Sequence, residues 1–344
     1  MLCVKTPRLN AEMVRRYLAR HKLMVNNYEI IGAEEFIYFP ISAADAELRH
    51  FLGRQGAGIV RRNSKKLPHL PPYRERLRKQ LGREYGNTIK GYDIIGDIAT
   101  IESRNRKTAL KIANAIASTN KNVKTVIRKV GPISGRYRTR KYEYVWGKRK
   151  YETVYKENGA VFSIDVRKSF FSTRLAYERS RINGLVGKGE KVMVMFAGVG
   201  PFAIEIAKSH KDAEVVAVEL NRQAYRYMIK NMELNRTKNV NAVLGDVNKV
   251  SGSYRHFADR IVMPLPKDSY RFLDSVLKVA KRRCVVHYYA FGGKDTAFKE
   301  HIVRLRDFFK SHGRGFKVIF KRVVRPYSPR DIEIVVDFVI VKST

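Results

Sequence analysis

The chain has 344 residues, 44% of them hydrophobic, and is long enough to fold into two or three domains. Its 69 Lys and Arg residues against 32 Asp and Glu residues give a formal net charge of +37, which favours a polyanionic partner such as nucleic acid. No run of about 18 apolar residues and no secretory pattern is present, so we expect a cytoplasmic protein without membrane association. The two cysteines, Cys3 and Cys284, are too few for a disulfide framework, and no Cys/His cluster has zinc spacing, so no metal is expected.

Residues 1–65 are expected to form a small α/β unit. Apolar periodicity predicts helices at 10–21 and 43–52 and a strand at 35–41. The basic segment 66–85, which contains three prolines, is typical of a linker between domains.

Residues 86–160 are expected to form a second α/β unit. The pattern predicts, in chain order, a strand pair, a helix and three strands, at 93–101, 108–118, 123–129, 142–146 and 151–157. A basic segment, Arg136–Lys141, precedes the last two strands.

From residue 161 to residue 344, strands and helices alternate. Strands are predicted at 191–196, 214–219, 240–244, 259–263 and 283–291, and helices between and after them at 201–210, 222–234, 269–280 and 295–312. A hairpin at 317–325 and 331–341 closes the chain. The alternation predicts a parallel sheet covered on both faces, hence a Rossmann-like α/β fold.

A glycine-rich turn follows the first strand of this region. Gly198 and Gly200 let the backbone approach a ligand, and Pro201 can begin the next helix. Glu219 ends the following strand, about 21 residues after Gly198, where a carboxylate can accept hydrogen bonds from both hydroxyls of a ribose. The pattern predicts a nucleotide cofactor, and by itself it would also suit NAD.

Other features favour S-adenosylmethionine over NAD. Asp246 follows the third strand, where an acid can meet an adenine amino group, and the closing hairpin is typical of class I methyltransferases. The fourth strand ends in Met263-Pro264-Leu265-Pro266, where a rigid wall and backbone carbonyls can face a methyl-accepting base.

Five segments share a pattern with one known family: Tyr92–Ala99, Arg136–Lys141, Val161–Val166, Phe171–Arg181 and Met195–Phe202. Through them the chain resembles the Trm5-type tRNA (guanine37-N1)-methyltransferases, the archaeal form in particular, over essentially its whole length. The most specific segment is the Phe-Ser-x-Arg-Leu-x-x-Glu-Arg-x-Arg run that begins at Phe171.

The resemblance implies three domains: a small N-terminal domain that checks the outer corner of tRNA, a middle RNA-binding domain, and a class I methyltransferase domain over residues 161–344. It implies methyl transfer from S-adenosylmethionine to N1 of the guanine that follows the anticodon. No obligatory protein partner is evident from the sequence, so a monomer is expected.

The resemblance also implies roles for individual residues. Glu178 matches the general base, which would remove the N1 proton, and Arg138 matches the arginine that steadies charge on guanine O6. Residues expected at the cofactor are Phe196, Gly198, Val199, Gly200, Pro201, Glu219, Leu220, Asp246, Val247, Arg179 and Pro264. Residues expected at the substrate are Arg136, Arg140, Tyr177, Arg181 and Pro266.

Without the resemblance, Glu178 reads as a helix-surface acid paired with Arg174 or Arg181, and the arginines of the basic segment read as phosphate contacts. Two positions depart from the family pattern. Val194 stands where an aspartate is frequent, and Pro264 where an asparagine usually contacts the base, which leaves backbone groups such as the carbonyls of Met263 or Leu265 for that task. The Pro-Leu-Pro form favours a single activity.

Three other functions compete with this interpretation. A related enzyme of the wybutosine pathway transfers an aminocarboxypropyl group, or methylates a tricyclic guanine, and its relatives tend to lack the N-terminal domain. A non-catalytic tRNA-binding protein with this fold would be expected to lose Gly198, Gly200, Glu219 or Asp246, all of which are present. An NAD-dependent oxidoreductase would gain nothing from the positive charge.

Overall fold

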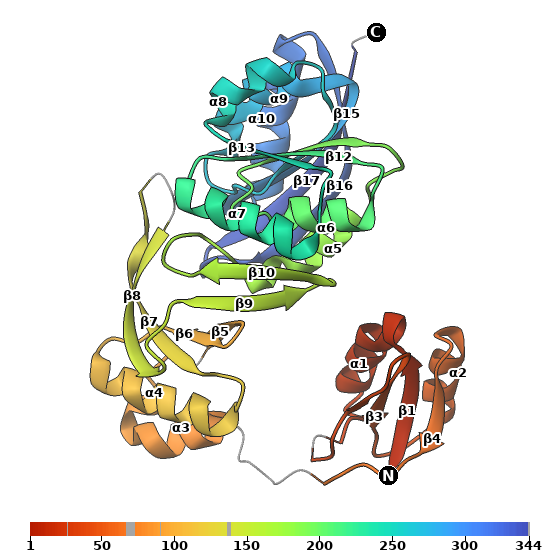
Figure 1. Ribbon diagram of the computed structural model, residues 1–344, viewed down its shortest axis with the longest axis vertical. Helices are drawn as coiled ribbons and strands as arrows, with labels where there is room; N and C mark the ends of the chain where they lie inside the picture. Colours follow the sequence, from red (N-terminus) through yellow and green to blue (C-terminus); the bar gives the residue numbers. More distant parts are fainter. Residues whose placement is uncertain (26, 67–72, 90, 136–138, 343–344) are drawn as a thin grey trace. The chain divides into compact units, whose positions relative to one another are not determined.

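The structure, a computed structural model, describes residues 1–25, 27–66, 73–89, 91–135 and 139–342. The chain divides into two compact units, Met1–Pro72 and Tyr73–Thr344 (Figure 1). No helix within the described ranges is long and apolar enough to cross a membrane.

The N-terminal unit is a four-stranded sheet with two helices. Its strand order is β2-β3-β1-β4, and the central strand β1 pairs antiparallel with both β3 and β4. The elements are β1 (Leu2–Pro7), η1 (Arg8–Asn10), α1 (Ala11–Arg20), β2 (Ile31–Gly32), β3 (Phe36–Pro40), α2 (Ala46–Arg54) and β4 (Gly58–Arg61). Val14 and Leu18 of α1 and Leu48 and Leu52 of α2 fill the core, at the spacing that gives each helix one apolar face.

The segment expected as a linker contains a helix, α3 (Tyr73–Leu81), and a 3₁₀ turn, η2 (Gly82–Tyr85). Leu77 and Leu81 are buried in one core with α4 (Arg106–Thr119). Residues 73–85 therefore belong to the second unit, which corrects the predicted linker. The four-residue spacing of the leucines makes a narrow apolar stripe that the surrounding basic residues conceal in the sequence.

After these residues the second unit continues with a sheet of strand order β5-β6-β7-β8, on which α4 packs. Its strands are β5 (Tyr92–Ile95), β6 (Ile98–Ile101), β7 (Thr125–Ser134) and β8 (Thr139–Gly147). β6 and β7 are parallel and joined through α4, and the other pairs are antiparallel.

A two-stranded hairpin follows, made of β9 (Glu152–Glu157) and β10 (Ala160–Asp165). The predicted boundary at residue 160 thus falls inside a hairpin. Figure 1 shows the hairpin between the four-stranded sheet and the larger sheet described next. Asp97, in the β5–β6 turn, accepts a hydrogen bond from the Thr153 hydroxyl at 2.7 Å, which ties the hairpin to the first sheet.

The outer edge of β10 is covered by two asparagines of α7 (Arg222–Asn235). The Asn235 carboxamide exchanges hydrogen bonds with the backbone N–H and C=O of Val161 at 2.8 and 2.6 Å. Asn231 does the same with Ser163 at 2.7 and 3.2 Å. Four helical residues advance about 6 Å and two strand residues about 6.6 Å, so the spacing of the asparagines matches that of the strand.

The larger sheet has seven strands in the order β13-β12-β11-β14-β15-β17-β16. Its strands are β11 (Lys191–Met195), β12 (Glu214–Glu219), β13 (Val240–Leu244), β14 (Ala258–Met263), β15 (Ala280–Gly293), β16 (Arg314–Pro326) and β17 (Asp331–Lys342). The first five in the order are parallel, and β17 and β16 are antiparallel to their neighbours. The pairing register of edge strand β16 shifts at Val318/Phe320 and Val323/Arg325.

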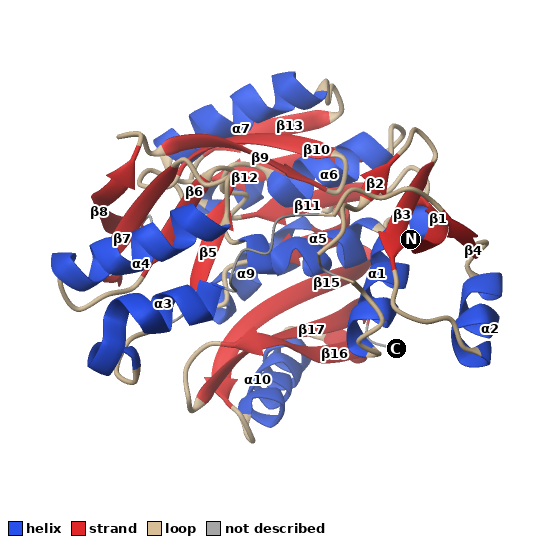
Figure 2. Ribbon diagram, turned by 90° about the horizontal axis from the view of Figure 1, so that it is seen from below, coloured by secondary structure: helices blue, strands red, loops and turns tan. Residues whose placement is uncertain are grey.

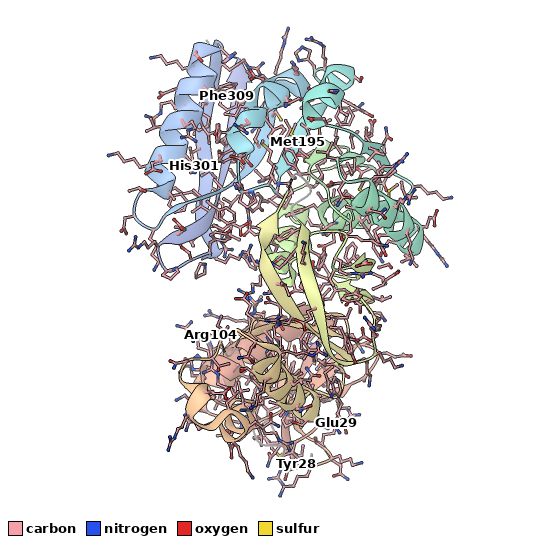
Figure 3. All side chains as sticks on the ribbon, turned by 90° about the vertical axis from the view of Figure 1, so that its left-hand side faces the viewer. Tyr28, Glu29, Arg104, Met195, His301 and Phe309 are labelled. Carbon is pink, nitrogen blue, oxygen red and sulfur yellow. The ribbon has the colours of Figure 1, made fainter. Side chains whose placement is uncertain are left out.

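Helices cover both faces of this sheet, as the sequence predicted. Successive β11 residues alternate: Val194 packs with α5, α6 and α7, while Met195 packs with α9 and α10. Figure 2 shows α10 along β15–β17, and Figure 3 labels Met195 together with His301 and Phe309 of α10. The helices and 3₁₀ turns are η3 (Thr173–Leu175), α5 (Ala176–Asn183), α6 (Pro201–Ser209), α8 (Val247–Val250), η4 (Ser251–Tyr254), η5 (Ser269–Phe272), α9 (Leu273–Val279) and α10 (Ala297–Ser311). The predicted α/β fold class is confirmed.

Candidate active site

A cavity of about 280 Å³ lies at the carboxyl ends of four parallel strands. The segments that follow β11, β12, β13 and β14 supply much of its wall, at 196–198, 219–221, 245–248 and 264–266. In open α/β sheets this end of the strands is where ligands bind. Among the residues that the structure describes, no group of three potential ligand side chains could hold a metal ion.

The glycine turn after β11 has the geometry that its sequence predicted. Gly198 and Gly200 have φ values of 60° and 88°, and α6 begins at Pro201. A Cβ atom on Gly200 would lie 2.9 Å from side-chain atoms of Ile204 and Met228, so a larger residue would displace α6 or α7. Gly198 and Pro201 line the cavity, whereas Gly200 shapes the turn behind it.

Val199 was expected at the cofactor but does not line the cavity. It is fully buried, and its carbonyl accepts a hydrogen bond from Asn231 at 3.0 Å. Phe196 does line the cavity, and its ring meets that of Phe272 edge-on at 4.6 Å between centroids. Val199 thus joins the glycine turn to α7, and its contact with the cofactor stays a prediction.

Glu219, at the end of β12, is the carboxylate expected to bind a ribose. It accepts hydrogen bonds from the backbone N–H groups of Gly198 and Asn221, both at 2.7 Å. Burial raises the pKa of its carboxyl above the usual value, and the two backbone donors oppose that rise. Because an ionised carboxylate has about four acceptor positions, the two hydroxyls of a ribose can still be accommodated.

The segment after β13 supplies a second carboxylate. Asp246 is the N-cap of α8 and accepts a hydrogen bond from the backbone N–H of Asn248 at 3.0 Å. Asp246, Val247 and Leu220 all line the cavity, as predicted for residues that hold a cofactor.

The Pro264-Leu265-Pro266 segment lines the cavity at the end of β14. The Leu265 carbonyl already accepts a hydrogen bond from the Ser269 hydroxyl, and the Pro266 carbonyl accepts one from the Phe291 backbone at 3.1 Å. These hydrogen bonds hold the segment in place. They also leave the Leu265 carbonyl with less capacity to accept a hydrogen bond from a base than the sequence suggested.

Arg179, expected at the cofactor, lines the cavity and is held by two buried carboxylates. Its guanidinium donates two hydrogen bonds to Glu157, and its Nε lies 3.6 Å from Oε1 of Glu205. Burial raises the pKa of Glu205 to about 8, and a hydrogen bond with Glu157 contributes to the rise. Near neutral pH the Glu205 carboxyl is therefore mostly protonated.

Glu178, the residue matched to the general base, does not line the cavity. Its side chain is buried, and Oε2 accepts hydrogen bonds from Arg181 at 2.9 Å and from the Tyr289 hydroxyl at 2.8 Å. Burial raises the pKa of Tyr289 well above its usual value, so its hydroxyl stays a donor. Of the two arginines that could have paired with Glu178, Arg181 does so, and Arg174 pairs with Asp93 instead.

Two residues expected at the substrate lie beside Glu178 and outside the cavity. Arg181 bridges Glu178 to Asp337, with its Nη1 2.6 Å from the Asp337 carboxylate. Tyr177 is half exposed, with the Arg322 guanidinium 4.4 Å from its ring centroid.

A second cavity, of about 220 Å³, lies between the four-stranded sheet and the catalytic region. It shares five lining residues with the first: Phe170, Phe171, Ser172, Arg325 and Tyr327. Lys129 and Arg140 line it from the four-stranded sheet, so the basic segment does reach this space through Arg140. Arg136 and Arg138 lie outside the described residues.

Several lining residues of the first cavity were not expected from the sequence, among them Phe291, Arg325, Tyr327 and Glu333. Arg325 donates to the Glu333 carboxylate across the β16–β17 hairpin at 2.5 Å, and Phe291 stacks on Tyr327. The feature of the sequence that could have predicted this part of the site is Glu333, an acidic residue within the apolar run that ends the chain.

Comparisons with known proteins identify the family of the chain. Three family models match in chain order: the tRNA methyltransferase 5 N-terminal domain (residues 3–48), the TYW2 N-terminal domain (73–150) and the TRM5/TYW2 methyltransferase domain (153–319). The chain is 36% identical to tRNA (guanine(37)-N(1))-methyltransferase Trm5b of Pyrococcus abyssi over 346 residues, 98% of each chain.

Solved structures give the same result. The complex of aTrm5 with tRNALeu superposes with a TM-score of 0.70 at 30% identity, over 99% of this chain and 100% of that chain. TYW2 of M. jannaschii in complex with AdoMet superposes with a TM-score of 0.59 at 27% identity, over 73% of this chain and 100% of that one. The chain belongs to the TRM5/TYW2 methyltransferase family.

Proposed function

We propose that the protein transfers a methyl group from S-adenosylmethionine to N1 of guanine 37 in tRNA. The observation that carries the proposal is the match to Trm5b over 98% of both chains, which includes the N-terminal unit as well as the catalytic sheet. The net charge of +37 fits a partner with a phosphate backbone.

The residues of the first cavity fit S-adenosylmethionine. Glu219 can accept from the ribose, Asp246 can accept from the adenine amino group, and Phe196 and Val247 offer apolar wall for the adenine ring. When bound, this cofactor supplies an electrophilic methyl group on a sulfonium ion. The protein then has to exclude water, orient the base and handle one proton.

The target guanine would enter where the two cavities meet. In this proposal Arg138 stabilises the charge that develops on O6, because a donor in a site without water binds the transition state better than the ground state. Glu178 is the candidate base because of its match to the family. Its carboxylate would have to turn away from Arg181 and Tyr289 to reach the cavity.

The deciding experiment is methyl transfer from labelled S-adenosylmethionine to unmodified tRNA transcripts, followed by nucleoside analysis. One transcript carries guanine at position 37, and a matched transcript carries adenine there. We expect 1-methylguanosine from the first and no product from the second. Methylation of another base or atom would keep the methyltransferase and contradict this substrate.

A second candidate function is a TYW2-type reaction on a modified guanine, which would transfer the aminocarboxypropyl group of the same cofactor. It is favoured by the match of residues 73–150 to the TYW2 N-terminal domain. A product that forms only on tRNA already carrying the tricyclic base would support it. Tight tRNA binding with no product on either substrate would indicate a binding protein.

The expectations of a monomer and of a cytoplasmic location stay predictions. Light scattering at micromolar protein concentration and cell fractionation would check them.

A further inference from the structure

Arg325 is one of the residues that line both cavities. It lies on edge strand β16, and its Nε donates to the carboxylate of Glu333 on the neighbouring strand β17 at 2.5 Å. Glu333 is only 1% exposed, so a buried carboxylate holds the Arg325 guanidinium in position. The Arg325 side chain is 22% exposed and reaches the cavity space.

The far end of the Arg325 guanidinium is available to a ligand. Within the described part of the chain, its only hydrogen bond runs from Nε to Glu333. Nη1 and Nη2 therefore present donors that Glu333 leaves free, in one plane and in a fixed direction. A planar fork of this kind matches two acceptors that lie side by side.

The surroundings of Arg325 suit a flat ring. Phe291 and Tyr327 stack with 4.0 Å between centroids at an interplanar angle of 30°, and Tyr327 lines both cavities. Pro264 and Pro266 line the same cavity and are rigid and apolar. Bases stack on aromatic side chains of this kind, so a base can lie here with one edge toward Arg325.

The charges around Arg325 favour a neutral hydrogen-bond acceptor over a phosphate as its ligand. The Arg325–Glu333 pair is neutral as a unit, so a phosphate bound to Arg325 would bring its charge close to the buried Glu333 carboxylate. Guanine presents two neutral acceptors, O6 and N7, on one edge, and arginine contacts that edge more often than any other base feature.

We infer that Arg325, positioned by Glu333, binds the O6–N7 edge of the target guanine and so contributes to the choice of guanine over adenine. The inference rests on the proposed function and adds a second arginine to the one matched from the basic segment. Adenine carries an amino group in place of O6, so a donor fork there would meet a donor. The assignment makes Glu333 a positioning residue that acts through Arg325.

The test compares guanine with 7-deazaguanine at position 37 of otherwise identical tRNA, made by ligation of synthetic RNA. Deazaguanine keeps O6 and N1 but replaces N7 with a C–H group. For the unsubstituted protein we expect single-turnover kcat/KM to be about fivefold or more lower on deazaguanine than on guanine, because one of the two hydrogen bonds of the bidentate contact is lost. For Arg325→Ala we expect kcat/KM on guanine to fall about tenfold or more and the two substrates to become equal.

Arg330→Ala is the matched control, because Arg330 is an exposed arginine at the tip of the same hairpin and lines neither cavity. It should keep both the rate and the discrimination. Arg325→Lys, which keeps the charge but not the fork, should lose the discrimination and serves if the alanine variant does not fold. Glu333→Ala should behave like Arg325→Ala, and Glu333→Gln, which can still accept from Nε, should restore most of the rate.

Three results would overturn the inference. They are equal rates on both substrates with the unsubstituted protein, an unchanged discrimination factor in Arg325→Ala, and a loss of cofactor affinity in that variant as large as its loss of rate. The last would place Arg325 at the carboxylate of the cofactor. If no transcript with guanine 37 is methylated at all, the proposed function fails first, so the two failures are distinguishable.

Discussion

Glu178 is a buried carboxylate of the catalytic region and Glu219 a half-buried one, and the two have different partners. Glu219 accepts from two backbone N–H groups and borders the cavity, whereas Glu178 accepts from Arg181 and Tyr289 and lies behind it. Oε1 of Glu178 has no hydrogen-bond partner among the described residues, although Arg322 lies 3.4 Å away. A buried acceptor without a hydrogen-bond partner is costly, which fits a group that has a second position to occupy.

Replacement of Glu178 by Gln tests its role as base. Gln can still accept from Arg181 and Tyr289 but cannot take up a proton, so we expect single-turnover methyl transfer to fall about a hundredfold or more. Tyr289→Phe, which removes one hydrogen bond and keeps the carboxylate, should have a smaller effect. A Glu178→Gln rate within a few-fold of the unsubstituted protein would assign Glu178 to structure alone.

Glu205 should make stability depend on pH. Its pKa is raised by burial from 4.5 to about 8, so the folded state binds a proton between these values that the unfolded state does not. The contribution of this proton to the free energy of unfolding is fully present below pH 4.5 and is lost as the pH rises through 8. Glu205→Gln cannot lose the proton, so its unfolding temperature should exceed that of the unsubstituted protein more at pH 8.5 than at pH 5.5.

The control for Glu205 is Glu214→Gln, at an exposed carboxylate paired with Lys191 on the same sheet. It should change the unfolding temperature equally at both pH values. An equal shift for Glu205→Gln as well would contradict a raised pKa.

The sequence predicted part of this site and missed part of it, for a physical reason. Gly198, Glu219 and Asp246 were identifiable because each lies at or just after the end of a strand that the apolar pattern marks. The Arg325–Glu333 pair was not, because its partners are eight residues apart and meet only through the register of a hairpin. The environment of Glu178 was also hidden, since Tyr289 is 111 residues away along the chain.

At the scale of elements, the β9–β10 hairpin depends on α7. An isolated two-stranded hairpin is marginally stable in water, and here Asn231 and Asn235 take the place of a third strand. Asn231 also donates to the Val199 carbonyl, so one side chain joins the hairpin to the glycine turn of the cofactor cavity.

Asn231→Ala should therefore act on stability and on the cavity together. It leaves the buried N–H and C=O groups of Ser163 unpaired, at a cost of about 1–3 kcal/mol for each such group, so the unfolding temperature should fall. Amide exchange at Ser163 and cofactor affinity, measured by calorimetry, should change as well. Asn241→Ala, at an exposed asparagine on β13, is the control. Unchanged exchange at Ser163 would show that the side chain does not hold the strand.

The strands of the parallel sheet were predictable because they are buried on both faces and read as apolar runs, as in Val192–Met195. β1 was not predicted, since a six-residue strand that includes Lys5 and Pro7 has a weak pattern. α3 was not predicted because of its charge: two leucines carry its apolar face among four basic residues.

At the scale of the whole molecule, the excess of cations governs association with RNA. A protein that neutralises several phosphates releases counterions, so its affinity falls steeply as salt rises. We expect the dissociation constant for tRNA to increase about a hundredfold or more between 50 and 200 mM salt, while the affinity for the cofactor stays nearly constant. Equilibrium binding of labelled tRNA checks this, and a flat salt response would refute binding through phosphates.

Edge strand β16 has a further consequence for the protein without RNA. It is 13 residues long, and Ile319, Phe320 and Val323 on it are exposed, so it could serve as a template for the strand of another molecule. Its two register shifts interrupt the regular row of hydrogen-bonding groups, and Lys317 and Lys321 add charge along it. Copies of the chain should therefore resist edge-to-edge aggregation even at the high concentrations reached during purification.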